Sequence, residues 1–328
     1  MMRGILARGM SIRSIRLFFA ACLLLVALGA VTAGAAAGAP RRNHEGAGGV
    51  IGGAFPYGPR NTLIGVPQTY TDKNGETLIE LAPGFDIGYN EIADANRGVD
   101  PWVPGKGARI NIPSFKVLPN GPHRGIVINL AEMRLYYYLG RRLVISYPVG
   151  IGMPGFPTPT GVYRITQKIT NPAWHVPAQI RRADPDIPLF VPAGSDNPMG
   201  LFALRLSRPT YLIHGTNRTF CVGLRASHGC IRLYNPDMKR LFRLVRKNTP
   251  VTIIYQPVKL GVRNGAIYVE AHTDYLHRQP DPLDAIGSEL AAAVDPYPID
   301  MKKLKRALRM RTGMPVKISA RAGLFPLP

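Results

Sequence analysis

Short runs of β-branched and aromatic residues recur through the middle of the chain, and glycine, asparagine and other turn residues separate them. Runs of this length and composition are typical of β-strands joined by tight turns. They cover residues 125–130, 133–139, 142–150, 160–165, 201–206, 210–213 and 251–255, with one more at 266–270. The pattern predicts a mainly β domain over residues 122–258.

A helix is predicted directly after residue 234. The apolar positions of this segment recur every three or four residues, so they would share one helical face. These positions are Met238, Leu241, Phe242 and Val245. Asn235 is the expected N-cap, followed by Pro236 at the first helical position and Asp237 in the first turn.

Residues 170–199 contain six prolines and show little periodicity. A loop of this length inside a compact domain is usually a functional lid or a disordered segment. Its large apolar residues favour an ordered flap that is anchored on the domain. The expected anchors are Trp174, Ile180, Leu189 and Phe190.

The segment at residues 67–116 has its own order of elements. An extended piece near Tyr70 is followed by two short runs of helical periodicity, around Leu78 and Ile92. An alternating strand then ends at Pro113, so the segment is expected to be a small α/β module. Residues 40–66, rich in glycine, proline and arginine, are expected to be a linker.

Residues 1–39 have the pattern of an export signal. Four arginines precede an apolar run, and small residues follow it. The arginines are Arg3, Arg8, Arg13 and Arg16. A cleaved signal peptide and a retained N-terminal anchor both fit this pattern. Both place the rest of the chain outside the cytoplasm, and an anchor would also tether it to a membrane.

The chain is strongly basic, with 41 Lys and Arg against 20 Asp and Glu and a formal net charge of +21. Without the four arginines of residues 1–39 the net charge is about +17. This balance suits an anionic partner such as a cell-wall polymer or a membrane surface. Nucleic acid is not expected, because the export pattern is present and no zinc-finger, basic-zipper or aromatic RNA-binding signature occurs.

The segment RASHGCIRL, residues 225–233, holds the candidate chemistry. His228 and Cys230 are two residues apart, so in an extended backbone their side chains point to the same side. An imidazole that takes the thiol proton produces a thiolate, which is the nucleophile in cysteine catalysis. Gly229 leaves room for a substrate backbone, and the N–H groups of Gly229 and Cys230 could face a developing oxyanion.

The spacing alone leaves two alternatives open. Imidazole and thiolate both suit zinc, so His214, His228 and Cys230 could hold a metal ion if Cys221 supplied a fourth ligand. A packing role without chemistry is the second alternative.

The segment from residue 211 to residue 237 resembles the signature of the L,D-transpeptidase family with the YkuD-type catalytic domain. That signature joins a His-Gly at a strand end to Ser-His-Gly-Cys, a hydrophobic residue and an arginine or asparagine. His214-Gly215 and the run from Ser227 to Arg232 match it. AEMRLYYY, PVGIG, TPTGVYRI and DNPMGLFAL extend the likeness over residues 125–258. It is strongest to the periplasmic ErfK/YbiS-like subgroup, which includes enzymes that tether lipoprotein to peptidoglycan.

Residues 67–116 resemble the LysM peptidoglycan-binding module. The matching elements are Tyr70, Gly75 to Leu78, Ala95-Asn96 and Ile112-Pro113, with Glu76 in place of the usual aspartate. The resemblance leaves open whether this module binds glycan or only holds the next domain in place.

The L,D-transpeptidase resemblance implies a β-sandwich or barrel that performs acyl transfer without a cofactor or a metal. Cys230 would be the nucleophile, His228 its base, and the amides of Gly229 and Cys230 the oxyanion hole. The residues implied to line the site, orient it or bind substrate are His214, Gly215, Ser227 and Arg232.

The implied substrate is a peptidoglycan stem peptide. Cys230 would attack the carbonyl of the diamino acid at position three, release the terminal D-Ala and hold the peptide as a thioester. An amine would resolve the thioester, either from a second stem peptide, which gives a 3-3 crosslink, or from a lipoprotein with a C-terminal lysine. The expected location is the periplasm. The rival hypothesis is a catalytically silent peptidoglycan-binding protein.

Cys221 lies nine residues before the candidate nucleophile and is expected to be apolar filler, since Phe220 and Val222 flank it. A disulfide with Cys230 that silences the enzyme is the alternative. Residues 259–328 are expected to be a basic C-terminal extension that carries no motif.

Overall fold

The computed structural model describes residues 53–183, 185–278, 281–294 and 298–319. All of them belong to a compact unit that spans Pro40–Pro328. The signal peptide or anchor expected at residues 1–39 lies outside the described residues, as does the first part of the expected linker. Within the described ranges, no helix combines the length and the apolar character needed to cross a membrane.

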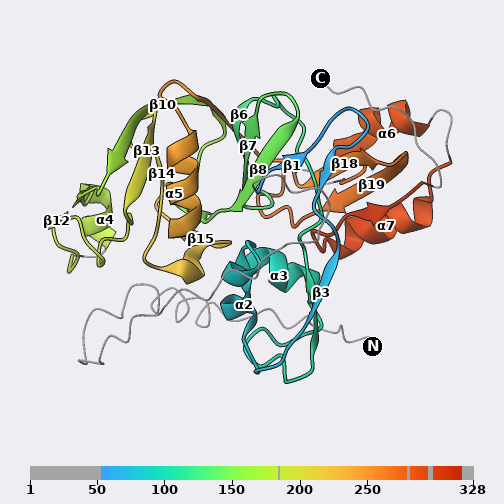
Figure 1. The fold of residues 1–328 in the computed structure, drawn as a ribbon, viewed down its shortest axis with the longest axis horizontal. Coiled ribbons are helices and arrows are strands. Elements are labelled where there is room, and N and C mark those ends of the chain that lie inside the picture. The colour runs from blue at the N-terminus through green and yellow to red at the C-terminus, as the bar shows by residue number, and fades with distance from the viewer. Residues whose placement is uncertain (1–52, 184, 279–280, 295–297, 320–328) are drawn as a thin grey trace, which may run out of the picture. The chain divides into compact units, whose positions relative to one another are not determined.

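A mixed sheet of nine strands forms the centre of the mainly β domain (Figure 1). Its strand order is β1-β8-β7-β6-β17-β10-β13-β14-β16, and neighbours are antiparallel except in the pairs β6–β17 and β14–β16. The strands are β1 (Phe55–Pro56), β8 (Leu143–Pro148), β7 (Arg134–Leu139), β6 (Gly125–Asn129), β17 (Pro250–Ile254), β10 (Gly161–Thr170), β13 (Phe202–Leu206), β14 (Leu212–His214) and β16 (Ile231–Arg232). The prediction of a mainly β domain is confirmed.

Helix α5 (Asn235–Leu244) packs against this sheet and lies alongside β13 in Figure 1. The apolar positions predicted for one face are all buried or half-buried: Met238, Leu241, Phe242 and Val245. The helix begins one residue earlier than expected, because Tyr234 is the N-cap and Asn235 already lies in the first turn. The Oδ1 atom of Asn235 has no hydrogen-bond partner among the described residues, so its side chain does not cap the helix.

The N-terminal module follows the predicted order of strand, helix, helix and strand. Its elements are β3 (Gln68–Thr71), α2 (Leu78–Gly84), α3 (Tyr89–Ala95) and β4 (Arg109–Ile112). β3 and β4 pair antiparallel, and α2 begins where Thr77 and Glu80 form a reciprocal capping box. Apolar side chains of both helices and of β4 form a separate small core, which includes Leu78, Leu81, Ile92, Ile110 and Ile112.

The linker expected at residues 40–66 is not a free linker over its described part. β1 pairs with β8, and β2 (Leu63–Ile64) pairs with β5 (Lys116–Val117). Leu63 and Ile64 are almost completely buried. Each of these strands has only two residues, which is too short for alternation to be visible within a glycine-rich segment.

The proline-rich flap is ordered by strand pairing and by one buried amide. β11 (Trp174–His175) pairs with β12 (Phe190–Val191), and the short helix α4 (Ala178–Ala183) lies between them in sequence. The buried side chain of Asn197 lies within hydrogen-bond distance of the carbonyls of Pro172 and Pro192.

The anchors expected for the flap hold only in part. Ile180 is buried and Trp174 is half-buried, as expected for side chains that fix the flap. Leu189 and Phe190 are 65% and 46% exposed, so they are not anchors. The apolar residues of the flap therefore indicated that it is ordered. The buried amide of Asn197, which also holds the flap, could not be recognised from the sequence.

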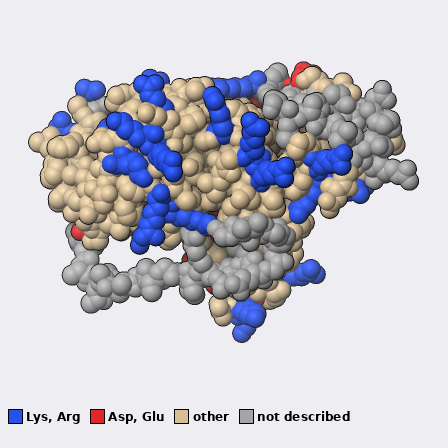
Figure 2. All heavy atoms as spheres, turned by 45° about the horizontal axis from the view of Figure 1, so that its top comes forward, with Lys and Arg blue, Asp and Glu red and all other residues tan. Residues whose placement is uncertain are grey.

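The part of the expected basic C-terminal extension that the structure describes, together with Val258, folds into regular elements that pack against the rest of the unit. The elements are β18 (Val258–Arg263), β19 (Ala266–Ala271), η2 (Asp284–Ile286), α6 (Gly287–Val294), α7 (Met301–Met310) and β20 (Val316–Lys317). β18, β19 and β20 form a sheet on which α7 packs through Leu304 and Leu308. Lys and Arg side chains cover the outer face of α7, and Figure 2 shows the same excess of basic over acidic groups across one face of the molecule.

A buried ion network joins the N-terminal module to the nine-stranded sheet. Glu91 of α3 pairs with Arg134 of β7 at 2.9 Å and also with Lys116 of β5. Burial alone would raise the pKa of the Glu91 carboxyl, but the charges of Arg134 and Lys116 outweigh it and lower this pKa. The module is therefore fixed to the sheet by charges that water does not screen.

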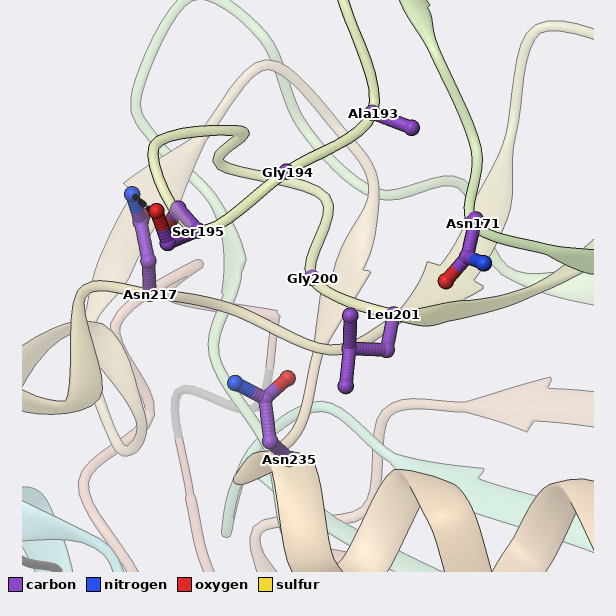
Figure 3. A pocket seen from close by; sticks show the side chains of 8 residues that line it. All are labelled: Asn171, Ala193, Gly194, Ser195, Gly200, Leu201, Asn217 and Asn235. Atoms are coloured by element: carbon purple, nitrogen blue, oxygen red, sulfur yellow. Dashed lines mark hydrogen bonds between the residues drawn. The ribbon is translucent and has the colours of Figure 1, made fainter.

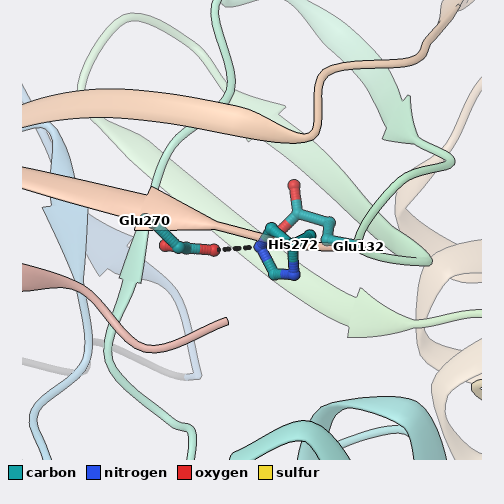
Figure 4. Close-up of side chains that lie close together, drawn as sticks. All are labelled: Glu132, Glu270 and His272. Carbon is teal, nitrogen blue, oxygen red and sulfur yellow. Dashed lines mark hydrogen bonds and ion pairs between the residues drawn. The ribbon is translucent and has the colours of Figure 1, made fainter. Parts of the chain in front are cut away.

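Glu132, Glu270 and His272 form a second buried group, with ligand atoms within 4.8 Å of one another (Figure 4). Carboxylates and imidazole are metal ligands, but here a protein cation lies between the carboxylates. Lys259 Nζ is 2.8 Å from an oxygen of Glu132 and 2.8 Å from an oxygen of Glu270, and His272 Nε2 is 2.7 Å from Glu270. We assign this group to an ion-pair network that ties β18 and β19 to the sheet.

Candidate active site

Strand pairing places two predicted site residues on one face at the edge of the sheet. His214 of β14 pairs directly with Arg232 of β16, and directly paired residues point to the same side. Ile213 and Ile231, one position earlier on each strand, point to the opposite side and are fully buried in the main core. The candidate site therefore occupies the face that lies away from this core.

Cys230 lies immediately before β16 and is half-buried. Its side chain packs at the edge of an apolar cluster that contains Met199, Ala203, Leu212, Ile169 and Trp174. Its Sγ donates a hydrogen bond to the Thr210 carbonyl at 3.7 Å. Burial raises the pKa of the thiol, although a backbone hydrogen bond with Leu212 and the charges of Arg232 and Arg205 oppose the rise. The resting sulfur is therefore a neutral thiol at neutral pH.

Ser227 fixes the backbone of the loop that carries the thiol. It ends β15 (Arg225–Ser227), which pairs in parallel with β9 (Ile151–Gly152). The hydroxyl of Ser227 donates to the Cys230 carbonyl at 2.6 Å and accepts from the Gly229 N–H at 3.1 Å. Ser227 is only 1% exposed. It orients the loop, and in this arrangement it is too buried to contact a substrate.

The amide of Gly229 is not available for the predicted oxyanion hole, because it donates to Ser227. Among the described residues, the backbone N–H groups of His228 and Cys230 have no hydrogen-bond partner. Gly229 adopts a φ of +101°, and a Cβ added there would lie 2.7 Å from the ring of Tyr211. Backbone conformation and Tyr211 therefore require glycine here, not the approach of a substrate.

The imidazole ring of His228 packs edge-on against Phe156, at a centroid distance of 4.7 Å. Burial, and then the charge of Arg232, lower the pKa of this imidazole. In the described part of the chain, no hydrogen bond joins this imidazole to the Cys230 thiol. The thiol hydrogen bond goes to Thr210 instead. The spacing of His228 and Cys230 thus brings them into one loop without pairing them.

His214 is 5% exposed, and its Nδ1 lies 2.6 Å from the Gly215 carbonyl. Because a carbonyl only accepts, Nδ1 carries the proton and Nε2 keeps a lone pair. Burial and the charge of Arg232 lower the pKa of His214 to about 4, against the backbone hydrogen bonds of Gly215 and Met199. His214 is therefore a neutral imidazole with a fixed tautomer.

Arg232 makes the site electropositive. Its Nη1 donates to the Ala226 carbonyl at 3.2 Å, and its buried Nε has no hydrogen-bond partner among the described residues. Its charge lowers the pKa of both His214 and His228 and opposes the rise at Cys230. A guanidinium on the site face suits an anionic substrate group.

Residues 123–253 match the L,D-transpeptidase catalytic domain, YkuD. Three proteins of Escherichia coli (strain K12) are similar over most of their length. The probable L,D-transpeptidase YcfS is 40% identical, across 80% of this chain and 86% of YcfS. The probable L,D-transpeptidase YbiS is 40% identical, across 78% of this chain and 89% of YbiS. The probable L,D-transpeptidase ErfK/SrfK is 39% identical, across 81% of this chain and 91% of ErfK/SrfK. The chain belongs to the L,D-transpeptidase family. The predicted resemblance, including the ErfK/YbiS-like subgroup, is confirmed.

A pocket of ≈ 530 Å³ in this L,D-transpeptidase lies between the flap and the start of α5 (Figure 3). It is lined by Asn171, Ala193, Gly194, Ser195, Gly200, Leu201, Asn217 and Asn235. The predicted substrate residue Gly215 is not among these residues, but it packs against one of them, since a Cβ on Gly200 would lie 3.0 Å from Gly215. The lining offers amides and one hydroxyl but no thiol, imidazole or charge. This pocket therefore supplies no nucleophile.

Cys221 follows the expectation of apolar filler. It ends the turn η1 (Thr219–Cys221), is 2% exposed, and no disulfide joins it to Cys230. In the described part of the chain, neither cysteine belongs to a group of three ligating side chains close enough to hold a metal ion. The zinc alternative therefore has no geometric support.

Sequence reasoning missed four residues of this site. Thr210 accepts the thiol hydrogen bond, and Thr158 donates to the Gly229 carbonyl at 2.9 Å. Phe156 packs on His228, and Arg205 acts on the thiol through its charge. Thr158 lies in the TPTGVYRI stretch that supports the family likeness, whereas the others reach the site only through folding.

Proposed function

We propose that this L,D-transpeptidase acts on peptidoglycan stem peptides and that Cys230 is its nucleophile. The observation that carries the proposal is the position of the thiol. It is half-buried on the face of the sheet that also presents His214 and Arg232, and Ser227 braces its loop. A nucleophile, two neutral imidazoles and a cation on one face suit acyl transfer from a carboxylate-bearing peptide.

We assign the role of general base to His214. The Gly215 carbonyl holds Nδ1–H, which leaves Nε2 as the acceptor. A base that is oriented by a third group is the usual arrangement behind activated nucleophiles. The thiol pKa is raised and the imidazole pKa is lowered, so the proton leaves the sulfur as the carbonyl is attacked rather than beforehand. His228, the base predicted from spacing, remains the alternative.

The oxyanion would be held by the unpartnered N–H groups of Cys230 and His228. Gly229 contributes its conformation, because a left-handed residue between these two amides lets both face the same side. Arg232 would bind a carboxylate of the substrate, and Gly215 would orient His214 through its carbonyl.

The reaction has two acyl transfers. The sulfur attacks the carbonyl at stem position three, and the thiol proton passes through the imidazole to the departing D-alanine amine. The tripeptide is left as a thioester. An incoming amine then attacks the thioester, loses its proton and restores the thiol. The acceptor would be a second stem peptide, which gives a 3-3 crosslink, or a lipoprotein lysine.

The remaining parts of the chain fit an exported wall enzyme. Residues 1–39 would direct export to the periplasm or anchor the protein at the membrane, and residues 67–116 would be a LysM-like module. The module also positions the catalytic loop: the N–H of Tyr89 donates to the Val222 carbonyl at 3.2 Å, close to the start of β15. Residues 258–319 would serve as a structural support rather than as a free basic extension.

A matched series of variants tests this function. Cys230→Ala should abolish both thioester formation and crosslinking of purified muropeptides, measured by mass spectrometry. His214→Gln should slow thioester formation by about 10² to 10⁴, and His228→Gln should slow it less. The reverse order would give the role of base to His228. A catalytically silent wall-binding protein would bind sacculi equally well in every variant and never form product. Adding a lipoprotein with a C-terminal lysine identifies the acceptor.

A further inference from the structure

Arg205 projects from the same face as the candidate nucleophile, although the family motif does not include it. The register of β13 and β14 pairs Arg205 with Leu212, so their side chains point to the same side. Leu212 packs with Cys230 in the apolar cluster of the site. Leu204, the neighbour of Arg205, points the other way and is fully buried in the main core.

The guanidinium of Arg205 is held in place by two hydrogen bonds. Its Nε donates to the side chain of Gln167, its cross-strand partner on β10, at 3.1 Å. Its Nη1 donates to the Pro209 carbonyl at 2.9 Å. The Cys230 thiol donates to the next carbonyl of the same turn, that of Thr210. The cation and the sulfur are therefore fixed on successive carbonyls of one turn.

The charge of Arg205 is unneutralised and reaches the sulfur. In the described part of the chain, neither Arg205 nor Arg232 forms an ion pair with a carboxylate, and Nη2 of Arg205 makes no hydrogen bond. Both arginines oppose the rise of the Cys230 pKa. A preoriented guanidinium with free donors, half-buried beside a reacting atom, is well suited to bind a carboxylate.

We propose that Arg205 binds a carboxylate of the donor peptide beside the scissile amide. The proposal rests on the proposed function, because it needs a peptide to be cleaved at Cys230. Two groups of the donor carry this chemistry. One is the C-terminal carboxylate of the leaving D-alanine, and the other is a side-chain carboxylate on the diamino acid. Binding of the first would select donors that end one residue after the attacked carbonyl, and binding of the second would select donors whose diamino acid carries a free carboxylate.

The experiment uses the full chain and three synthetic donor tetrapeptides. One has free carboxylates, one has a C-terminal amide, and one has an amidated side-chain carboxyl group. Thioester formation is followed by intact-mass spectrometry as a function of donor concentration, which separates KM from kcat. The proteins are wild type, Arg205→Gln, Arg205→Lys and the control Arg243→Gln. Arg243 is an exposed residue of α5 outside the site.

For the free-acid donor, Arg205→Gln should raise KM by about ten- to hundredfold with a small change in kcat. The KM of Arg205→Lys should lie between those of wild type and Arg205→Gln, and the KM of Arg243→Gln should match that of wild type. Amidation of the bound carboxylate should raise the KM of wild type by the same factor and leave the KM of Arg205→Gln unchanged. The donor that shows this pattern identifies the bound carboxylate.

The proposal is overturned if Arg205→Gln leaves KM unchanged, or if it weakens all three donors equally. A kcat loss with a lower melting temperature and no rescue by lysine would also overturn it, since that pattern reports only a structural role. If wild type itself never forms a thioester, the proposed function fails and this inference fails with it.

Discussion

The Ser227 hydroxyl donates a hydrogen bond to the backbone carbonyl of Cys230 over 2.6 Å. The same oxygen accepts the N–H of Gly229 at 3.1 Å, so one buried side chain sets the backbone on both sides of the turn before the nucleophile. The geometry of the thiol within its loop therefore depends on a hydroxyl that substrate does not reach.

Ser227→Ala should remove both hydrogen bonds and leave the Gly229 N–H buried without a partner. The free energy of unfolding should fall by about 1–3 kcal/mol, and thioester formation should slow at least tenfold, because the loop is no longer held. Urea denaturation measures the free energy of unfolding, and acid-quenched mass spectrometry measures the rate of thioester formation. Ser195→Ala, an exposed serine of the flap, should change neither. Equal activity of the two variants would show that the loop holds its shape without Ser227.

Alkylation of Cys230 should show a raised thiol pKa. Burial raises this pKa above that of a free cysteine, and the nearby arginines only partly offset it. The rate of reaction with iodoacetamide should therefore rise with a midpoint above about 8.5. Peptide mapping separates Cys230 from the buried Cys221. A midpoint near neutrality would mean a preformed thiolate and imidazolium, contrary to the order of steps proposed above.

The secondary structure and the motif could be predicted because both are local. The β-branched and aromatic runs of the strands and the apolar face of α5 follow directly from neighbouring residues. The family motif joins Cys230 and His214 in one signature, and the pairing of β14 with β16 brings both to the same edge of the sheet. The predicted N-cap was wrong by one residue. Helix-compatible residues follow both Tyr234 and Asn235, and only the backbone angles of Tyr234 show where the helix begins.

The tertiary partners could not be predicted, because they join residues far apart in the chain. The thiol bonds Thr210 rather than the nearby His228, and Arg205 reaches the site only through strand register. The pairing of Glu91 with Arg134 crosses from the N-terminal module to the sheet. A charged residue in a sequence gives no sign of whether it will be buried with a partner.

Glu91 provides a test of that buried pairing. Glu91→Gln removes the carboxylate that neutralises Arg134 and Lys116 and leaves both cations buried, so the free energy of unfolding should fall by about 3–5 kcal/mol. Asp94→Asn on the same helix breaks an exposed pair with Arg97 and should cost less than about 1 kcal/mol. Denaturant unfolding of both variants gives the comparison, and similar losses would refute the role of burial.

The pKa of His214 should make stability depend on pH. The folded value is about 4, below the value of about 6.5 in the unfolded chain. Between these values the unfolded chain binds more protons, so stability is lost as the pH falls. The contribution of His214 should fall by about 2 kcal/mol between pH 8 and pH 5. Wild type should lose that much more stability than His214→Gln over this range, measured by urea unfolding. Equal losses would mean that His214 is not held neutral.

The most direct test of the account is the covalent state of Cys230 during turnover. The folded full-length protein is mixed with a donor tetrapeptide, quenched in acid and mapped by mass spectrometry. The account predicts a tripeptide thioester on Cys230, labile to hydroxylamine, with one D-alanine released per adduct. A folded protein whose Cys230 is open to alkylation, yet never carries the tripeptide, would contradict it.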